Sequence, residues 1–427
     1  MIQPIHLCIV GAGSCYTPEL IDGILSREDA DLPIASLRLM DTDPKRLAVM
    51  AGLSERMLRH RERGIPVRSG TRLEPLLEGA NFVITQIRVG GMAARRLDET
   101  IPLRYGIIGQ ETTGPGGMCK ALRTIPPMLD IARSVERVAP AAVILNYTNP
   151  SGIITEAVTR YTGARLVGLC SGMPGIRQEL ARRLGPRYPG LQTDCVGLNH
   201  LGFVHRIRSE GRDVTGEAIE RLCAEDEREA TDNAEMALPR VTRALGAVPI
   251  SYALYYLRRS DRLKEAADRK ETRADTVARV EREILEESAR PETVTRPEAL
   301  DRRGGHGYAA ITFSVLHAIL HNTGDELAMS VPNRGAVAGI AADAAVEVVC
   351  RVDASGATPL PVGPIPPAFR GLVLAVKAYE TLTVEAAVRR ERRLVKQALV
   401  NHPLVGDLDV IDPLVEEMLA AHGLAFS

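Results

Sequence analysis

The fold class follows from residues 6–14, which read His6-Leu7-Cys8-Ile9-Val10-Gly11-Ala12-Gly13-Ser14. The first five residues form a short, β-favouring apolar run, which predicts a strand. The glycines end that run, and the stretch from residue 18 to residue 25 then has a helical pattern. A strand, a tight glycine turn and a helix in this order predict the opening of a βαβ unit.

The rest of the N-terminal half repeats this alternation. A second strand is expected at residues 36–40, followed by a helix at 44–58. Three more apolar strands, at 81–87, 142–145 and 165–169, alternate with helical segments. Because this pattern is typical of parallel sheets covered by helices on both faces, we predict an α/β fold with a Rossmann-like, doubly wound parallel sheet over residues 1–190.

The C-terminal half, residues 191–427, predicts a mixed α+β domain, because the alternation is weaker there. A short strand is expected at 195–198, and interleaved Glu and Arg predict a solvated helix at 264–287. A last helical region at 372–399 is expected to pack as core or against another subunit, in a homodimer or homotetramer. A dinucleotide domain followed by a mixed domain is the architecture of lactate and malate dehydrogenases.

The composition excludes several classes of protein. The chain has 427 residues and a net charge of −1, so no overall positive field attracts nucleic acid or an anionic membrane. Its seven cysteines show no paired short spacing, which predicts reduced thiols and a cytoplasmic location. With no signal-like leader and no 18-residue apolar run, we expect neither secretion nor a membrane span.

The glycine turn is typical of a dinucleotide site. Gly11 and Gly13 let the backbone approach a pyrophosphate, and Ser14 leads into a helix whose N-terminus offers amide donors. The third glycine of the usual fingerprint is missing, since Tyr16 stands in its place. A plain strand-turn-helix is therefore the alternative.

An acidic residue, Asp41, closes the second predicted strand. Its carboxylate can accept hydrogen bonds from both ribose hydroxyls and repel a 2′-phosphate, which favours NAD over NADP. Capping a helix is the alternative role. That role suits Asp43 better, because Asp43 directly precedes Pro44, the first residue of the predicted helix.

Polar segments at 86–91, 110–117 and 146–150 lie at the expected carboxyl ends of strands. Open α/β sheets bind their ligands at this edge. Asn146 is a candidate for the nicotinamide edge of the cofactor, and Asn149 for a sugar hydroxyl. Ordinary surface loops and an asparagine turn are the alternatives.

A cysteine and a histidine end two further predicted strands. Cys170 follows the strand at 165–169 and His200 follows the strand at 194–199, so both can face one crevice. A thiolate and an imidazole can hold a divalent ion and leave positions open for substrate oxygens. A buried inert cysteine and a satisfied histidine would look the same. Three tyrosines cluster in residues 249–256, where packing is the more usual role.

Together these motifs resemble glycoside hydrolase family 4, most of all its 6-phospho-β-glucosidase branch. The order and spacing of the matching segments, rather than any one of them, carry the resemblance. The segments are 11–14, 88–91, 109–117, 146–150, 168–170, 197–200, 272–273, 303–305, 331–335 and 377–380.

The resemblance implies hydrolysis of 6-phospho-glycosides by a redox route, outside the usual scheme of paired carboxylates. In this route NAD takes hydride from C3 of the sugar, and the proton on C2 is then removed. A divalent metal, usually manganese, stabilises the enediolate that forms. The C1 substituent is eliminated, water adds, and the hydride returns to C3.

The resemblance also assigns the site residues. Cys170 and His200 become the metal ligands, and Tyr252 becomes the base at C2, with Tyr255 as second choice. Tyrosine can serve as a base only if a metal or another cation lowers its pKa. Sugar hydroxyls are assigned to the catalytic-site residue Glu111 and to Asn149, and the 6-phosphate to Arg88, Arg273 and Arg303. For each arginine, a surface ion pair is the alternative.

The chain departs from the family branch in two loops. Ser171 stands where the branch usually has asparagine, and Ala309 and Ala310 stand where it tends to have a serine and an acidic residue. His306 is also unexpected. These changes bear on which sugar, anomer or 6-substituent is accepted.

Three other functions are compatible with the same pattern. One is the same mechanism acting on a different or unphosphorylated glycoside. Another is a 2-hydroxy-acid dehydrogenase, which would not need Cys170 or a metal and would accumulate NADH. The third is a catalytically silent NAD-binding sensor.

Overall fold

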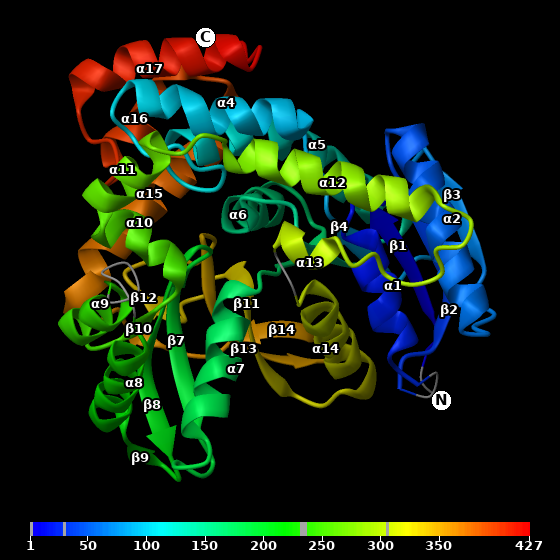
Figure 1. Cartoon of the computed structure of the whole chain (residues 1–427), viewed down its shortest axis with the longest axis horizontal. Coiled ribbons are helices and arrows are strands. Elements are labelled where there is room, and N and C mark those ends of the chain that lie inside the picture. The colour runs from blue at the N-terminus through cyan, green and yellow to red at the C-terminus, as the bar shows by residue number, and fades with distance from the viewer. Residues whose placement is uncertain (1–2, 29–30, 231–236, 305–306) are drawn as a thin grey trace.

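The computed structural model describes residues 3–28, 31–230, 237–304 and 307–427 (Figure 1). At its centre lies a nine-stranded sheet. In spatial order its strands are β14 (Gly356–Pro359), β13 (Ala345–Asp353), β11 (Asp325–Pro332), β6 (Arg165–Gly168), β5 (Val143–Asn146), β4 (Phe82–Thr85), β1 (Ile5–Val10), β2 (Ile34–Met40) and β3 (Val67–Gly70).

Six of these strands form the predicted doubly wound sheet. Strands β3, β2, β1, β4, β5 and β6 lie side by side in this order, and every neighbouring pair is parallel. Every residue of β4 and β5 is buried, as expected for parallel strands covered on both faces. The strand order reverses direction between β1 and β4, the place where such sheets bind ligands.

The sheet continues with strands from the C-terminal half. Strand β11 pairs antiparallel with β6 through Ser330 and Gly168, and β13 and β14 extend the sheet in antiparallel order. A second sheet holds β7 (Gln192–Leu198), β8 (Leu201–Ser209), β9 (Arg212–Asp213) and β10 (Val248–Pro249), and a small pair joins β12 (Val337–Ala338) to β15 (Gly363–Pro364). One sheet thus takes strands from both sides of residue 190, and the predicted domain boundary there stays a prediction.

Helices cover both sheets (Figure 1). Those of the first half are α1 (Thr17–Leu25), α2 (Pro44–His60), α3 (Glu74–Leu77), α4 (Gly91–Arg104), α5 (Gly114–Val138), α6 (Ser151–Tyr161) and α7 (Gly172–Leu184). Those of the second half are α8 (Thr215–Glu229), α9 (Ala237–Leu245), the 3₁₀ turn η1 (Ser251–Ala253), α10 (Leu254–Leu257), α11 (Arg259–Ala267), α12 (Arg273–Ala289), α13 (Leu300–Arg303), α14 (Tyr308–His321), α15 (Pro367–Arg389), α16 (Arg392–Asn401) and α17 (Leu408–Ala421).

The prediction of one continuous, solvated helix at residues 264–287 is wrong in two respects. It is two helices, α11 and α12, because Thr272 and Asp275 form a capping box that starts a new helix. Moreover, α12 is not a solvated helix. It buries Val277, Val280 and Ile284 while passing from α4 to α2 (Figure 1).

The helical region predicted at 372–399 is also divided. Helix α15 ends at Arg389 because Arg390 adopts a left-handed conformation with φ 58°, and α16 then begins at Arg392. A further helix, α17, follows where the sequence analysis expected none. The three pack together near the C-terminus, and their predicted role in assembly stays a prediction.

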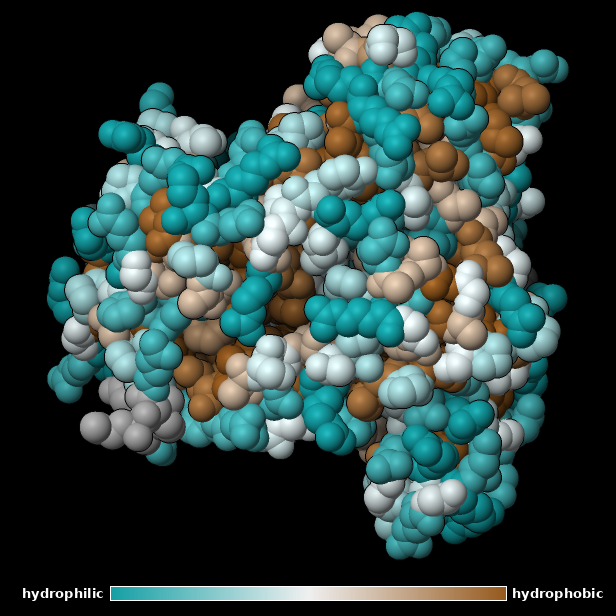
Figure 2. Space-filling model, turned by 180° about the vertical axis from the view of Figure 1, so that it is seen from behind, coloured by the Kyte–Doolittle hydropathy of each residue, from teal (hydrophilic) through white to brown (hydrophobic). Residues whose placement is uncertain are grey.

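The core and the surface agree with the composition. All seven cysteines are free, and their predicted redox state stays a prediction. In the described ranges no helix is both long and apolar enough to cross a membrane. Seen from behind, hydrophilic residues predominate, and the apolar ones lie mainly in recesses between them (Figure 2).

Candidate active site

One large cleft runs along the edge of the sheet where the parallel strands end, and it encloses about 1280 Å³. This exceeds the usual size of a pocket for one small molecule, so a cofactor and a substrate can share it. Twelve of the thirteen residues assigned to the site from the sequence line it: Gly11, Gly13, Ser14, Asp41, Arg88, Glu111, Asn149, Cys170, His200, Tyr252, Arg273 and Arg303.

The glycine turn allows two close backbone approaches at one end of the cleft. Gly11 has φ +88°, and a Cβ there would lie 2.9 Å from the backbone of Gln86. A Cβ on Gly13 would lie 2.9 Å from Oδ2 of Asp41. Neither position has room for a side chain, so the turn between β1 and α1 requires glycine at both, and both glycines line the cleft.

Asp41 is held in place beside this turn. Its Oδ2 accepts a hydrogen bond from the Gly13 N–H at 2.8 Å, and its Oδ1 accepts one from the Asp43 N–H at 2.9 Å. Asp43 caps α2 by accepting from the N–H groups of Lys45 and Arg46. The structure thus gives the capping role to Asp43 and leaves the Asp41 carboxylate on the cleft.

Asn146 does not line the cleft, in contrast to the other candidates. Its side chain is completely buried, and its Oδ1 accepts hydrogen bonds from Thr85 Oγ1 at 2.9 Å and from the Thr148 N–H at 3.0 Å. The amide therefore fixes the loop after β5 instead of facing the cleft. Asn149, three residues later, is the asparagine that this loop presents to the cleft.

Glu111 is the centre of a cluster of cations. Its carboxylate lies 2.5 Å from Arg88 Nη1, 2.7 Å from Lys120 Nζ and 3.1 Å from Arg95 Nη1. Burial alone would raise the pKa of Glu111, but these cations together hold it well below its usual value. Glu111 is therefore a permanent carboxylate that can accept a hydrogen bond from a sugar hydroxyl, and it is not a proton donor.

Two members of this cluster, Arg95 and Lys120, were missed in the sequence analysis. Burial lowers the pKa of Lys120 to about 7, although Glu111 opposes the shift. The ammonium group can therefore lose its proton near neutral pH. Neither residue had a distinctive signal, because Arg95 and Glu99 look like an ordinary helical ion pair, and Lys120 lies inside the amphipathic helix α5.

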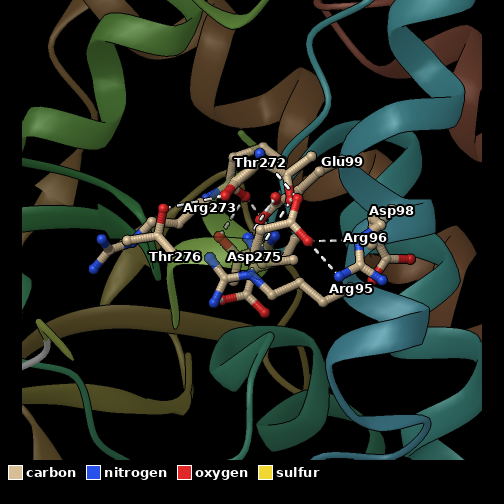
Figure 3. Close-up of polar contacts among 12 residues, drawn as sticks. Arg95, Arg96, Asp98, Glu99, Thr272, Arg273, Asp275 and Thr276 are labelled. Carbon is tan, nitrogen blue, oxygen red and sulfur yellow. Dashed lines mark hydrogen bonds and ion pairs between the residues drawn. The ribbon is translucent and has the colours of Figure 1, made fainter. Parts of the chain in front are cut away.

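A chain of contacts joins this cluster to the start of α12 (Figure 3). Glu99 accepts a hydrogen bond from Arg95 Nε at 2.7 Å and another from the Ala274 N–H at 2.9 Å. The adjacent Arg273 donates from Nη2 to the carbonyl oxygen of Arg303 at 2.7 Å. In the described part of the chain Arg273 contacts no carboxylate, so its charge is available to a ligand.

Arg303 is largely engaged within the protein. Its guanidinium donates to Glu281 at 2.6 Å and lies 4.0 Å over the ring of Tyr16. Its backbone accepts from Arg273, and the Tyr16 hydroxyl donates to the next carbonyl, that of Gly304, at 2.5 Å. Arg303 therefore forms an ion pair with Glu281, which was the alternative role given for it in the sequence. This ion pair is buried, however, and does not lie on the surface.

Cys170 and His200 both face the cleft from neighbouring strand ends. His200 occupies the two-residue turn between β7 and β8, with φ 65°. Burial lowers its pKa to about 4, so the imidazole is neutral, and its buried Nδ1 has no hydrogen-bond partner. Burial raises the pKa of the Cys170 thiol to about 12. This donor pair fits a divalent cation, which would displace the thiol proton on binding.

Tyr252 packs directly on the histidine of this pair, with ring centroids 4.1 Å apart and planes 7° from parallel. Burial raises its pKa, which is the opposite of what a base requires, although Arg95 acts to lower it. A cation next to His200 would supply the missing shift. The second choice, Tyr255, does not line the cleft and lies 6.0 Å from the Tyr252 ring.

Ser171, Ala309 and Ala310, which differ from the residues usual in the family branch, do not all lie at the cleft. Ser171 lines it, whereas Ala309 is buried against α1, next to Gly23, and Ala310 is exposed outside it. Gly305 and His306 lie outside the described residues. Of the described departures, only Ser171 can touch a ligand in the cleft.

Two family models match most of this chain. "Family 4 glycosyl hydrolase" matches residues 6–185, and "Family 4 glycosyl hydrolase C-terminal domain" matches residues 195–405. These matches agree with the resemblance found in the sequence motifs.

Related proteins match nearly the whole chain. A "Probable 6-phospho-beta-glucosidase" of Bacillus subtilis (strain 168) is 36% identical over 432 residues, which are 99% of this chain and 97% of the relative. A maltose-6′-phosphate glucosidase of the same organism is 31% identical over 431 residues, 97% of this chain and 95% of the relative.

Solved structures give the same picture. A 6-phospho-beta glucosidase from Thermotoga maritima, determined with manganese, NAD⁺ and glucose-6-phosphate, has a TM-score of 0.88 and 30% identity over 99% of each chain. A lactate dehydrogenase from a deep-sea metagenome library has a TM-score of 0.55 at 11% identity, covering 91% of this chain and all of that one. The second likeness concerns the fold alone and confirms the predicted dehydrogenase-like architecture.

Proposed function

Because this chain belongs to family 4 of the glycosyl hydrolases, we propose that it hydrolyses 6-phospho-glycosides, chiefly 6-phospho-β-glucosides, by the oxidation and elimination route described above. The greater identity to the β-acting relative than to the α-acting one supports the β-anomer.

The cleft residues divide between cofactors and substrate. NAD, when bound, supplies a reversible hydride acceptor, and a divalent cation, manganese in the first instance, supplies a Lewis acid. Gly11, Gly13 and Asp41 would hold the dinucleotide, and Cys170 and His200 would hold the cation. Ser14 at the start of α1 adds a polar contact for the dinucleotide.

The protein's own side chains would place the sugar and remove its proton. Asn149 and Glu111 bind sugar hydroxyls, and the ionised carboxylate of Glu111 can only accept. Tyr252 Oη takes the proton from C2, since the ring lies against the His200 imidazole and within the cleft. Lys120, whose pKa is about 7, is available to pass a proton onward near neutral pH.

The observation that carries the phosphate assignment is the excess of positive charge at one part of the cleft. Arg88, Arg95 and Lys120 converge on Glu111, and Glu99 is a second partner of Arg95, so these three cations face two carboxylates. Among the described residues Arg273 contacts no carboxylate and donates instead to the Arg303 carbonyl. Buried cations such as Arg95 and Lys120 are costly when cations outnumber carboxylates, and a 6-phosphate would supply the missing anion. Arg273 is exposed on the cleft, where its charge can reach the same phosphate. Arg303 is the weaker candidate because Glu281 already pairs with it.

The test compares kcat/KM for a 4-nitrophenyl 6-phospho-β-glucoside and its unphosphorylated counterpart, with NAD, Mn²⁺ and a reductant present. We expect at least about a hundredfold preference for the phosphorylated sugar, because each charge-assisted hydrogen bond contributes roughly 1.5–3 kcal/mol. Arg273→Met should remove a large part of this preference. Arg302→Met is the matched control, since Arg302 is exposed and pairs with Glu283.

Two results would contradict the proposal. Equal rates on the two sugars would show that the arginines serve the structure instead of binding phosphate. NADH released in proportion to substrate would favour the 2-hydroxy-acid dehydrogenase, because the proposed route needs NAD only in amounts far below substrate.

A further inference from the structure

The turn before β2 and helix α14 bring three metal-binding side chains together outside the cleft. His317 and His321 stand one helical turn apart on α14, with ring centroids 4.3 Å apart and planes 23° from parallel. Asp31 Oδ1 lies 3.1 Å from His317 Nε2 and 4.0 Å from His321 Nε2. The three ligand atoms all lie within 4.8 Å of one another.

These separations match those of neighbouring ligands on one metal ion. Two ligand atoms bound at about 2.1 Å, at angles between a right angle and a tetrahedral one, lie roughly 3.0–3.4 Å apart. The Asp31–His317 pair already has this spacing. The Asp31–His321 pair needs a shift of less than about 1 Å, which a small rotation of the imidazole provides.

The backbone of the same turn contributes another oxygen. The carbonyl oxygen of Asp31 lies 2.9 Å from His321 Nε2, which donates a hydrogen bond to it when that nitrogen carries the proton. Binding a metal through Nε2 moves the ring proton to Nδ1 and brings this carbonyl next to the ion. The tautomer change costs little, since the ring stays neutral throughout.

The donor types and their exposure select the class of metal. Two imidazoles and one carboxylate suit zinc and its first-row neighbours, whereas calcium and magnesium prefer oxygen ligands alone. The side chains of Asp31, His317 and His321 are 38%, 32% and 24% exposed, so an ion can reach them. Arg27 lies 3.5 Å from Asp31 Oδ2, which leaves Oδ1 to face the histidines.

We infer that Asp31, His317 and His321 form a second metal site, for Zn²⁺ or a similar ion, which fastens the turn before β2 to α14. None of the three lines the cleft. The site nevertheless supports one wall of it, because α14 begins at Tyr308, a lining residue, and the Gly307 N–H donates to Glu19 of α1 at 3.0 Å. Figure 1 shows α14 and α1 side by side.

The test is a titration of the metal-stripped protein with Zn²⁺, followed by equilibrium dialysis and thermal unfolding. Cys170→Ala serves as the background, because it weakens the cleft site. In this background we expect one bound Zn²⁺ and a rise in Tm of at least about 3 °C at saturation. Adding His317→Ala or His321→Ala should lower the affinity at least about tenfold and abolish the rise in Tm.

The matched control is His60→Ala, an exposed histidine at the end of α2, which should change neither result. Asp31→Asn keeps the shape of the turn and should weaken Zn²⁺ binding while leaving the Tm of the metal-free protein unchanged. This variant therefore tests the site even if a histidine variant folds poorly. Equal Zn²⁺ binding with and without His317 and His321 would overturn the inference.

Discussion

At the scale of single residues, we propose that Asp41 selects the dinucleotide, because two backbone N–H groups hold its carboxylate beside the glycine turn. We predict that Asp41→Ser lowers the preference for NAD over NADP at least about tenfold, because the repulsion of the 2′-phosphate is lost. Arg46, which lines this end of the cleft and lies 3.5 Å from Glu281, would then offer that phosphate a guanidinium. The measurement is the Kd of each dinucleotide by titration calorimetry.

Asp43→Ser provides the control for this change. Serine still caps α2, so stability and cofactor preference should both stay near those of the unaltered protein. If Asp43→Ser changed the preference as much as Asp41→Ser does, the selection would not come from the Asp41 carboxylate.

Cys170 is proposed to bind the cation, and desolvation raises the pKa of its thiol to about 12 when no cation is bound. We predict that Cys170→Ser weakens Mn²⁺ binding and lowers kcat at least about a hundredfold, while the Kd for NAD changes less than about threefold. Cys223→Ser is a matched control, because the Cys223 thiol already donates to the Pro239 carbonyl, as a hydroxyl can. Full activity of Cys170→Ser, or of the unaltered enzyme in excess chelator, would exclude the metal role.

At the scale of elements, Glu99 connects α4 to the start of α12, as Figure 3 shows. We predict that Glu99→Ala raises KM for the 6-phospho-glycoside at least about tenfold, with a smaller effect on kcat. The physical reason is that Arg95 loses a partner beside Glu111, and the α12 terminus that carries Arg273 loses an anchor.

The control is Glu286→Ala, at an exposed position on α12. If Glu99 had a purely structural role, Glu99→Ala would lower Tm and leave KM unchanged. A rise in KM would instead indicate that Glu99 positions Arg95 and Arg273. Glu99→Gln should give a partial effect, since the amide oxygen can still accept one of the two hydrogen bonds.

At the scale of the whole molecule, buried neutral histidines limit stability in acid. Burial lowers the pKa of His402 to about 3, and its Nε2 contacts Thr113 Oγ1 at 3.1 Å and the Gly114 N–H at 3.2 Å. The unfolded chain binds this proton near pH 6.5, so stability falls as the pH drops from about 6.5 towards 3.

We predict that His402→Gln reduces this acid sensitivity. The free energy of unfolding, measured by urea at pH 7.5 and pH 4.5, should decrease less in the variant, by roughly 2–3 kcal/mol. The variant should be the less stable protein at pH 7.5, since His402 contacts the start of α5 there. His60→Gln, at an exposed position, should leave the pH dependence as it is.

Much of the fold and of the site was predictable because both rest on local signals. The alternation of apolar strands, the glycine turn and the acidic strand end determined the parallel sheet and the dinucleotide end of the cleft. Cys170 and His200 were expected at one crevice because each follows a predicted strand, and both line the cleft. They come from different sheets, since β6 belongs to the nine-stranded sheet and β7 to the second sheet.

Only the tertiary structure decided which of the remaining charges matter. Arg95 and Lys120 lie on helices where the sequence pattern is that of ordinary ion pairs or core packing, and their convergence on Glu111 depends on how α4 and α5 pack. The same holds for Asn146, which folding turns inward, and for Asp31, which meets His321 across 290 of the 427 residues. The spacing of apolar residues in the sequence predicts each helix or strand by itself. Contacts between elements that are distant in the sequence form only when those elements pack.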